Sequence, residues 1–204
     1  MIKLSIFAMK SIVYMAVICA IMKLGQKVNN EITMRVNQAK AAFERAVNGK
    51  APQSLSTTIR QAAKTYNVDP LILEVIAKKE SNGGNARALY RFEPELYSRL
   101  RSKKSFQRFS DSEVRMLASS HGPFHILGIT GENECGVHFS HLYDYEVAAD
   151  CAARIVSKIK ADSRGEVKEI FRRYNGQGPK ADVYAQSAMV ELASLLYQRQ
   201  RVSG

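Results

Sequence analysis

The sequence predicts an α-helical protein with one main domain. Through most of residues 55–204, apolar residues recur every three or four positions, as they do on the buried face of a helix. Few segments alternate apolar and polar residues as strands do, apart from a short possible strand at residues 124–129. Of the 204 residues, 46% are hydrophobic, which is enough to fill one core. We therefore expect an all-α, or α-dominated, domain at residues 55–204, preceded by two segments at residues 1–24 and 25–54.

The first segment is hydrophobic and flanked by lysines. Residues 12–22 are continuously apolar, with Lys3 and Lys10 before them and Lys23 after them. This run is shorter than the roughly 17–25 residues of a full membrane span, and it resembles the apolar centre of a signal peptide. No good small-x-small cleavage site follows it, so we expect an uncleaved signal anchor or a membrane-inserting helix. A cleaved signal and a buried N-terminal helix are the alternatives.

The second segment reads as an amphipathic helix at residues 31–48, a spacer or a partner helix. Its apolar stripe is spaced by threes and fours, at Ile32, Val36, Ala39, Phe43 and Ala46. Gly49 and Pro52 stop it, and residues 49–54 read as the boundary of the main domain.

The helices of the main domain follow one another along the chain. Asp69 and Pro70 have the residue types of an N-cap and a first helical position, and Ser110 with Glu113 has the form of a capping box. The apolar stripes lie at residues 59–66, 71–76, 114–118, 148–159, 167–174 and 183–198. No internal repeat or low-complexity tract interrupts this pattern.

The charge balance predicts an anionic partner. The chain has 30 Lys and Arg against 19 Asp and Glu, a net charge of +11. Nucleic acid, anionic lipid and bacterial wall polymer all carry the opposite charge. The sequence has no phosphate-binding glycine loop, no Trp, and no clustering of aromatic residues with Lys and Arg of the kind that stacks bases. We therefore expect no specific nucleic-acid binding.

The cysteines and histidines do not form a recognisable metal site. The three cysteines are Cys19, in the apolar segment, and Cys135 and Cys151, which can pair if the domain works in an oxidising compartment. The four histidines are His121, His125, His138 and His141, and their spacing matches no metal-ligand motif. Metal binding is the weaker interpretation, and we expect no metal and no cofactor.

One glutamate ends a helix beside a glycine-rich loop. Ile72, Ile76 and Glu80 fall on one row of the helix that begins at Pro70, and residues 82–84 follow as Asn-Gly-Gly. A carboxyl group beside apolar side chains loses solvation of its charged form. A carboxyl that keeps its proton can donate it to a leaving oxygen, which is the acid step of glycoside cleavage. An isolated surface glutamate near a helix end is the plain alternative.

Four segments in order carry a resemblance to a known family. They are KESNG (79–83), RFEPELYSR (91–99), ASSHGPFHILGI (118–129) followed by Cys135-Gly136, and RYNG (173–176) followed by Tyr184. This order resembles the phage and bacterial N-acetylmuramidase family, endolysin-type members of the lysozyme superfamily. More distantly it is similar to goose-type lysozymes and soluble lytic transglycosylases. The resemblance covers about residues 57–197 and implies a lysozyme-like domain.

The resemblance also implies roles for individual residues. Glu80 is then the catalytic acid, and Glu93 is either a second carboxylate of the cleft or a brace for the loop after Glu80. The residues expected to bind substrate are Ser120, Gly122, Phe124, His125, Ile126, Gly128, Tyr174 and Asn175. Tyr174 also fits the last core position of its helix, and Asn175-Gly176 fits a C-cap. Both roles of that segment can hold together.

The chain departs from the family pattern at two histidines. The family usually has Trp where this chain has His121, which is smaller and offers less stacking surface. It usually has Gln where this chain has His125, which still offers a ring nitrogen to a sugar or to the backbone. Between the second and third segments lies a basic stretch with Arg99, Arg101, Lys103, Lys104 and Arg108. We read that stretch as solvated surface, with contact to an anionic wall as the alternative.

Taken with these observations, the resemblance implies a glycosidase that cleaves peptidoglycan between N-acetylmuramic acid and N-acetylglucosamine, in phage entry or host lysis. The alternatives are a lytic transglycosylase that yields anhydro-muropeptides, and a non-catalytic virion or membrane component on a lysozyme scaffold. A basic nucleic-acid-binding helical module is the more distant rival. Peptidoglycan is the expected partner, with membrane association through residues 1–24 and virion partners. The expected location is a membrane anchor, the periplasm, the cell wall or the virion.

Overall fold

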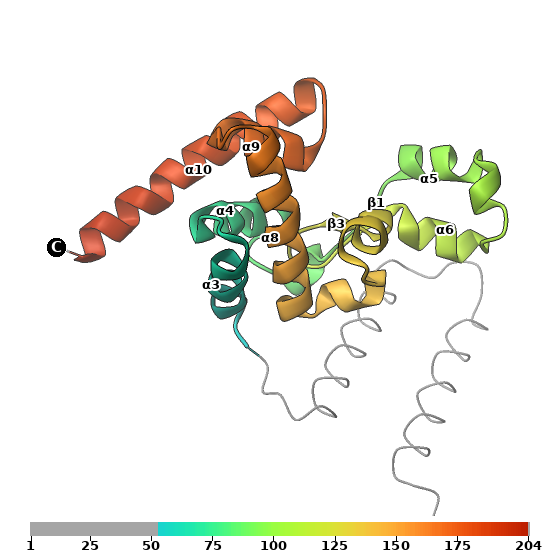
Figure 1. The fold of residues 1–204 in the computed structure, drawn as a ribbon, viewed down its shortest axis with the longest axis horizontal. Coiled ribbons are helices and arrows are strands. Elements are labelled where there is room, and N and C mark those ends of the chain that lie inside the picture. Colours follow the sequence, from blue (N-terminus) through green and yellow to red (C-terminus); the bar gives the residue numbers. More distant parts are fainter. Residues whose placement is uncertain (1–52, 204) are drawn as a thin grey trace, which may run out of the picture.

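A computed structural model describes residues 53–203 (Figure 1). In this part of the chain, helices dominate and one small three-stranded sheet joins them, so the α-dominated fold is confirmed. The helices are α3 (Leu55–Tyr66), α4 (Pro70–Ser81), α5 (Pro94–Arg101), α6 (Asp111–Leu117), α7 (Gly128–Thr130), α8 (Tyr145–Asp162), α9 (Val167–Asn175) and α10 (Pro179–Ser203). Short 3₁₀ or π turns are η1 (Ala86–Ala88), η2 (Lys104–Phe106), η3 (Gly131–Cys135) and η4 (Phe139–Tyr143). The strands are β1 (Tyr90–Phe92), β2 (Ser119–His121) and β3 (Ile126–Leu127).

The two segments predicted before the domain lie outside the described residues. These are the hydrophobic segment at residues 1–24 and the amphipathic helix with its linker at residues 25–54, of which only the last two residues are described. Within residues 53–203, no helix combines the length and the apolar character that a membrane span needs.

The ends of α4 follow local rules that the sequence displays. The Asp69 side chain accepts a hydrogen bond from the Leu71 N–H at 2.8 Å, and Pro70 opens the helix. At the other end Asn82 adopts a left-handed conformation with φ of 52°, and its N–H donates to the Lys78 carbonyl. The predicted capping box also forms, because the Ser110 and Glu113 side chains each bond the other's backbone N–H at the start of α6.

The sheet is larger than the sequence predicted. The strand expected at residues 124–129 is present only at Ile126–Leu127, and Gly128 already begins α7. Strands β1 and β2 were not predicted. β2 pairs with both neighbours in antiparallel fashion, so that Arg91, Ser120 and Leu127 form one row across the sheet, and Tyr90, His121 and Ile126 form the next. Because neighbouring rows point to opposite faces, these two sets have different surroundings.

The core centres on α4. Its side chains are buried on nearly every side, including Leu73, Val75 and Ile76, as is typical of a helix enclosed by others. Alanines on one face of α8 (Ala148, Ala149, Ala152 and Ala153) are fully buried and allow a close approach of the neighbouring helices. Figure 1 shows α8 crossing the middle of the molecule, with α5 and α6 at the opposite end from the C-terminus of α10. The C-terminal end of α4 therefore lies near the sheet, between the end of the molecule with α5 and α6 and the end with α10.

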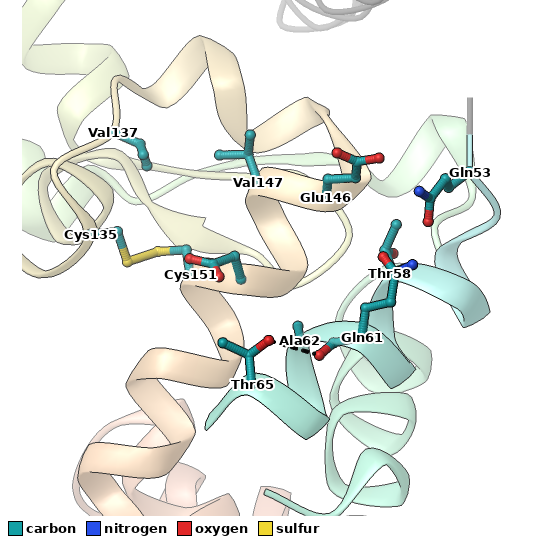
Figure 2. A pocket seen from close by; sticks show the side chains of 11 residues that line it. Gln53, Thr58, Gln61, Ala62, Thr65, Cys135, Val137, Glu146, Val147 and Cys151 are labelled. Carbon is teal, nitrogen blue, oxygen red and sulfur yellow. Dashed lines mark hydrogen bonds between the residues drawn. A yellow bond between two sulfur atoms is a disulfide. The ribbon is translucent and has the colours of Figure 1, made fainter. Parts of the chain in front are cut away.

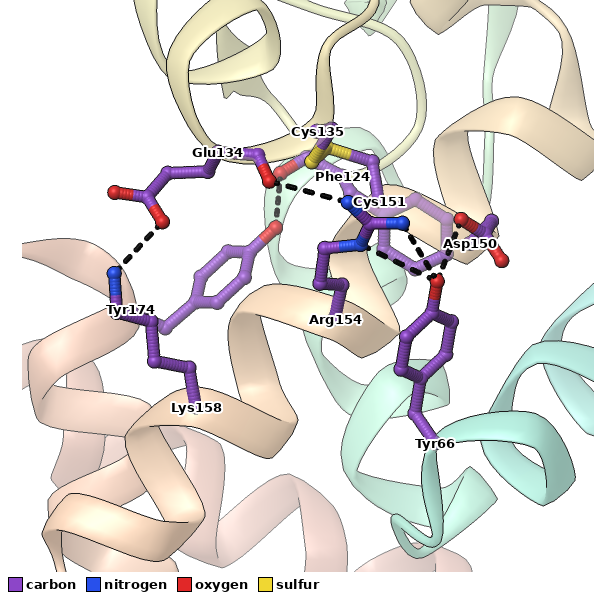
Figure 3. Close-up of a disulfide and its surroundings, with 9 residues drawn as sticks. All are labelled: Tyr66, Phe124, Glu134, Cys135, Asp150, Cys151, Arg154, Lys158 and Tyr174. Atoms are coloured by element: carbon purple, nitrogen blue, oxygen red, sulfur yellow. Dashed lines mark hydrogen bonds and ion pairs between the residues drawn. A yellow bond between two sulfur atoms is a disulfide. The ribbon is translucent and has the colours of Figure 1, made fainter.

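A disulfide joins Cys135 to Cys151, across 16 positions of sequence (Figure 3). It fastens η3 to α8, beside a polar network in which the Tyr66 hydroxyl donates to Asp150 at 3.0 Å and Arg154 donates to Tyr66 at 3.3 Å. Lys158 contacts Glu134 at 2.8 Å in the same region. The possible pair foreseen from the sequence is thus formed in the structure.

Removing this link is expected to destabilise the domain. Closing a loop of about 15 residues stabilises a fold by roughly 3 kcal/mol in the chain-entropy account. Replacing Cys135 and Cys151 together by Ser is expected to lower the free energy of unfolding by about 2–4 kcal/mol, measured by urea titration. In reductant, the free energy of unfolding of the wild type should approach that of the variant. The free energy of unfolding of the variant should not change with reductant. Equal stability of all forms would contradict a structural role for the disulfide.

Candidate active site

Glu80 lies in the last turn of α4, facing a pocket beside the sheet. Its side chain is only 5% exposed. The row predicted for α4 is present, because Ile72 and Ile76 are buried below it. The next residue fixes this end of the helix: the Ser81 hydroxyl donates to the Pro123 carbonyl at 2.8 Å and accepts from the Gly84 N–H at 2.8 Å. Ser81 thereby ties α4 to the loop that carries His125.

The pocket has a volume of about 250 Å³ and gathers six of the ten predicted site residues. Those six are Glu80, Glu93, Ser120, His125, Tyr174 and Asn175, and they come from α4, β2, α9 and the segments around the sheet. Arg91, Glu95, Leu96, Arg99 and Leu127 complete its lining. Residues up to 95 positions apart in sequence therefore meet at one site.

Arg91 joins the two predicted carboxylates. Its Nε lies 2.6 Å from Glu93 Oε1, and its Nη1 lies 3.7 Å from Glu80 Oε2. Ser120, opposite Arg91 across the sheet, has its hydroxyl 3.5 Å from the same Glu93 oxygen. The Glu93 side chain is 34% exposed, so the two glutamates differ sharply in their access to solvent. Glu93 is therefore a solvated carboxylate paired with a cation, whereas Glu80 is enclosed.

His125 is the closest ionisable neighbour of Glu80. Its Nδ1 lies 3.2 Å from Glu80 Oε2, within ion-pair distance although the geometry is not that of a hydrogen bond. Its Nε2 lies 2.6 Å from the Ala88 carbonyl oxygen. The residue has a φ of 47°, which is uncommon for a side chain other than glycine. The loop after β2 thus turns the imidazole towards the carboxyl group.

Two tyrosines close the site from the C-terminal helices. The Tyr174 hydroxyl donates to the Phe124 carbonyl at 2.9 Å (Figure 3). Burial, and next the charge of Glu80, hold the pKa of Tyr174 well above its usual value. The same two causes raise the pKa of Tyr184, whose buried hydroxyl interacts with Glu80 without reaching hydrogen-bond geometry. Both phenols therefore stay neutral beside the carboxyl group.

The other four predicted residues build the wall behind the pocket. Phe124 and Ile126 are buried in the core. Gly122 has a φ of 73°, and a Cβ there would lie 1.8 Å from the Leu142 carbonyl oxygen. At Gly128 a Cβ would lie 2.6 Å from the Met116 carbonyl oxygen. These glycines permit close backbone contacts, and none of the four lines the pocket.

His121 belongs to the core, not to a sugar-stacking surface. Its ring is fully buried, stacked on Phe139 with ring centroids 5.2 Å apart. Nε2 lies 2.8 Å from the Met116 carbonyl and must donate to it, so Nδ1 accepts from the Tyr143 hydroxyl at 3.0 Å. Burial lowers the pKa of His121 from the usual 6.5 to about 4. The structure thus keeps this ring neutral.

Arg91 and Tyr184 were not among the predicted site residues. Arg91 carries a usable signal, because Arg91 and Glu93 lie two positions apart and so share one face of an extended segment. Tyr184 was named only as part of the fourth segment of the resemblance, and by its own pattern an aromatic residue on a helix with apolar spacing indicates core. Its place near Glu80 follows only from how α10 packs across α4.

A second pocket, of about 520 Å³, lies between α3 and α8 beside the disulfide (Figure 2). Its acidic side chains are Glu146 and Asp150, and Asp150 already accepts a hydrogen bond from Tyr66. No group of three or more His, Cys, Asp or Glu side chains within residues 53–203 is placed to hold a metal ion. We place the candidate active site at the smaller pocket, where an enclosed carboxyl group faces further polar side chains.

Comparison with models of known protein families gives no match, and comparison with curated protein sequences gives none either.

The burial of neutral His121 makes stability depend on pH. Between about pH 6.5 and about pH 4 the unfolded chain takes up a proton at His121 and the folded chain does not, so stability falls as pH falls. This difference in proton uptake lowers the free energy of unfolding by about 3 kcal/mol across that range. The free energy of unfolding should fall between about pH 7 and about pH 4 in both proteins. In His121→Gln this fall is expected to be about 2–3 kcal/mol smaller than in the wild type.

Urea titration at both pH values measures this difference. If the variant does not fold, the ring nitrogens of His121 in the wild type give the same answer by NMR, and protonation near pH 6.5 would contradict the burial argument.

Proposed function

We propose that this protein is a lysozyme-like glycosidase that cleaves the β-1,4 bond between N-acetylmuramic acid and N-acetylglucosamine in peptidoglycan. The observation that carries the proposal is the enclosed Glu80 side chain, 5% exposed, on the wall of a pocket that also holds Glu93. Two carboxyl groups in unlike surroundings are what an acid and a second catalytic group require.

The chemistry assigned to Glu80 is proton donation. Its carboxyl proton goes to the glycosidic oxygen as the bond from that oxygen to the anomeric carbon of N-acetylmuramic acid breaks. The sugar becomes oxocarbenium-like, and the leaving N-acetylglucosamine carries the new hydroxyl group. Neutral Tyr174 and Tyr184 beside Glu80 add no charge to the site. The Glu80 carboxylate left behind faces the guanidinium of Arg91.

The second step decides between hydrolysis and transglycosylation. For hydrolysis, Glu93 takes a proton from water as the water oxygen bonds to the anomeric carbon. Its 34% exposure gives water access to the carboxylate. A lytic transglycosylase is the second candidate, because Arg91 Nε at 2.6 Å already occupies one oxygen of Glu93, which leaves the other oxygen for water. In that case the 6-hydroxyl of the muramic sugar attacks, loses its proton and yields the anhydro product.

The setting that we propose is outside the cytoplasm, in the periplasm or cell wall, in phage entry or host lysis. The disulfide supports this location, since such bonds persist in oxidising compartments. The basic residues at the end of α5 and in the segment between α5 and α6 are exposed. One of them, Arg99 of α5, also lines the pocket. These charges suit a wall polymer that carries carboxylates. Anchoring through residues 1–24 and virion partners remain part of the proposal.

Glu80→Gln tests the acid. Gln keeps the shape of the side chain but has no proton to give, so the release of muropeptides from purified peptidoglycan should fall by on the order of 10²–10⁴. Glu74→Gln is the matched control, because Glu74 lies on the same helix but pairs with Arg199 away from the pocket. Mass spectrometry of the products reports activity and bond type together. Near-wild-type activity of Glu80→Gln, or an inactive wild type, would overturn the proposal.

Glu93→Gln tests the second carboxylate. If Glu93 activates water, hydrolysis should fall by roughly 10²-fold or more, while the melting temperature changes little. Glu95→Gln serves as the control. It removes the same charge from the same pocket, but the ion pairs of Arg91 are with Glu80 and Glu93, and not with Glu95. Anhydro-muropeptides from the wild type, with unchanged rates in Glu93→Gln, would assign the reaction to transglycosylation.

A further inference from the structure

The ring of His125 is fixed by the backbone on one side and faces Glu80 on the other. A carbonyl oxygen only accepts, so the contact of 2.6 Å to Ala88 requires that Nε2 carries a hydrogen. In the neutral ring Nδ1 is then a bare acceptor. Flipping the ring would place carbon atoms at both positions and lose both contacts. The orientation is therefore determined by the two oxygens.

A bare Nδ1 against a charged carboxylate would be repulsive. With 3.2 Å between Nδ1 and Glu80 Oε2, the contact is favourable only when one of the two groups carries a proton. The His125 side chain is 7% exposed, and its buried Nδ1 makes no hydrogen bond in the described structure, so Glu80 is the polar group that it faces. The ring cannot turn to solvent without leaving the pocket wall. A proton at this contact therefore belongs to His125 and Glu80 as a pair, and it is lost from the pair as a whole.

We propose that His125 is a positioning residue that shares one transferable proton with Glu80, so that the two side chains act as a single acid. The proposal rests on the proposed function for its catalytic meaning. Either Glu80 holds the proton and donates to Nδ1, or His125 holds it and faces a carboxylate. Donation to the glycosidic oxygen leaves a carboxylate and a neutral ring. In hydrolysis Glu93 takes the proton of the attacking water and releases it to solvent, and the pair takes up a proton from solvent. In transglycosylation the proton that the sugar hydroxyl loses restores the pair.

The groups around the pair set the direction of its pH response. Arg91 from β1 lies 3.7 Å from the Glu80 oxygen and opposes proton uptake. Tyr174 from α9 and Tyr184 from α10 are neutral. His121 from β2 is neutral above about pH 4. Glu93, Glu95 and Arg99 complete the charged lining of the pocket. Unlike all of these groups, His125 makes a contact with Glu80 that becomes stronger when a proton is present.

His125→Gln removes the shared proton and keeps a polar side chain. A Gln amide that donates to Glu80 stabilises the charged carboxylate, so activity should disappear at lower pH than in the wild type. The ratio of wild-type to variant kcat/KM should grow about tenfold between ~pH 5 and ~pH 8, as a displacement of about one pH unit requires. His141→Gln, the same change outside the pocket, should give a constant ratio. A constant ratio for His125→Gln as well would contradict the proposal.

A measurement without substrate separates this proposal from the proposed function. The ring nitrogens of His125 are followed by ¹⁵N NMR across pH in the wild type and in Glu80→Gln. The wild-type ring should stay in its proton-sharing state to higher pH than the ring of Glu80→Gln, in which Nδ1 faces an amide. The same pH response in both proteins would overturn the pairing, whatever the protein does to peptidoglycan. A different response with no cleavage would support the pair and refute the glycosidase.

Discussion

The hydrogen bond from Ser81 to the Pro123 carbonyl joins two of the segments that form the pocket. On one side of it, α4 ends with Glu80, and the left-handed Asn82 lets the chain leave at once. On the other side, the loop after β2 carries His125. The acid and its neighbour would otherwise belong to independent segments, and a shift of about 1 Å between such groups is enough to spoil a catalytic geometry. The buried Ser81 hydroxyl thus links them directly, and the bond from Tyr174 to the Phe124 carbonyl holds the same loop from α9.

Local signals explain which parts of the fold could be predicted from the sequence. Asp69-Pro70 and the capping box at Ser110 satisfy backbone groups within a few residues, so the sequence displays them directly. Strands β1 and β2 have three residues each and gain their stability from pairing across 27 to 31 positions, from Phe92–Ser119 to Tyr90–His121. Three residues are too few to show a period of two. The sheet, and with it the place of Arg91, therefore depends on contacts that no local pattern records.

The same distinction applies within the candidate site. Glu80 was predicted because its helix row and its loop are both local features, and the structure encloses it as that row implies. His121 and His125 stand four residues apart and looked alike in sequence, but the alternation of the strand sends His121 into the core, and the left-handed turn sends His125 to the pocket.

The two rows of the sheet face different surroundings, the pocket on one side and the core on the other. Arg91, Ser120 and Leu127 line the pocket, one residue from each strand, whereas Tyr90, His121 and Ile126 pack behind them. A protein engineer can therefore vary the first row as a small combinatorial set and leave the second row as a constant scaffold. Gly122 lies outside that freedom, because the Leu142 carbonyl leaves no space for any side chain there. The backbone beside the pocket is therefore a constant frame, and the positions open to variation are those whose side chains line the pocket.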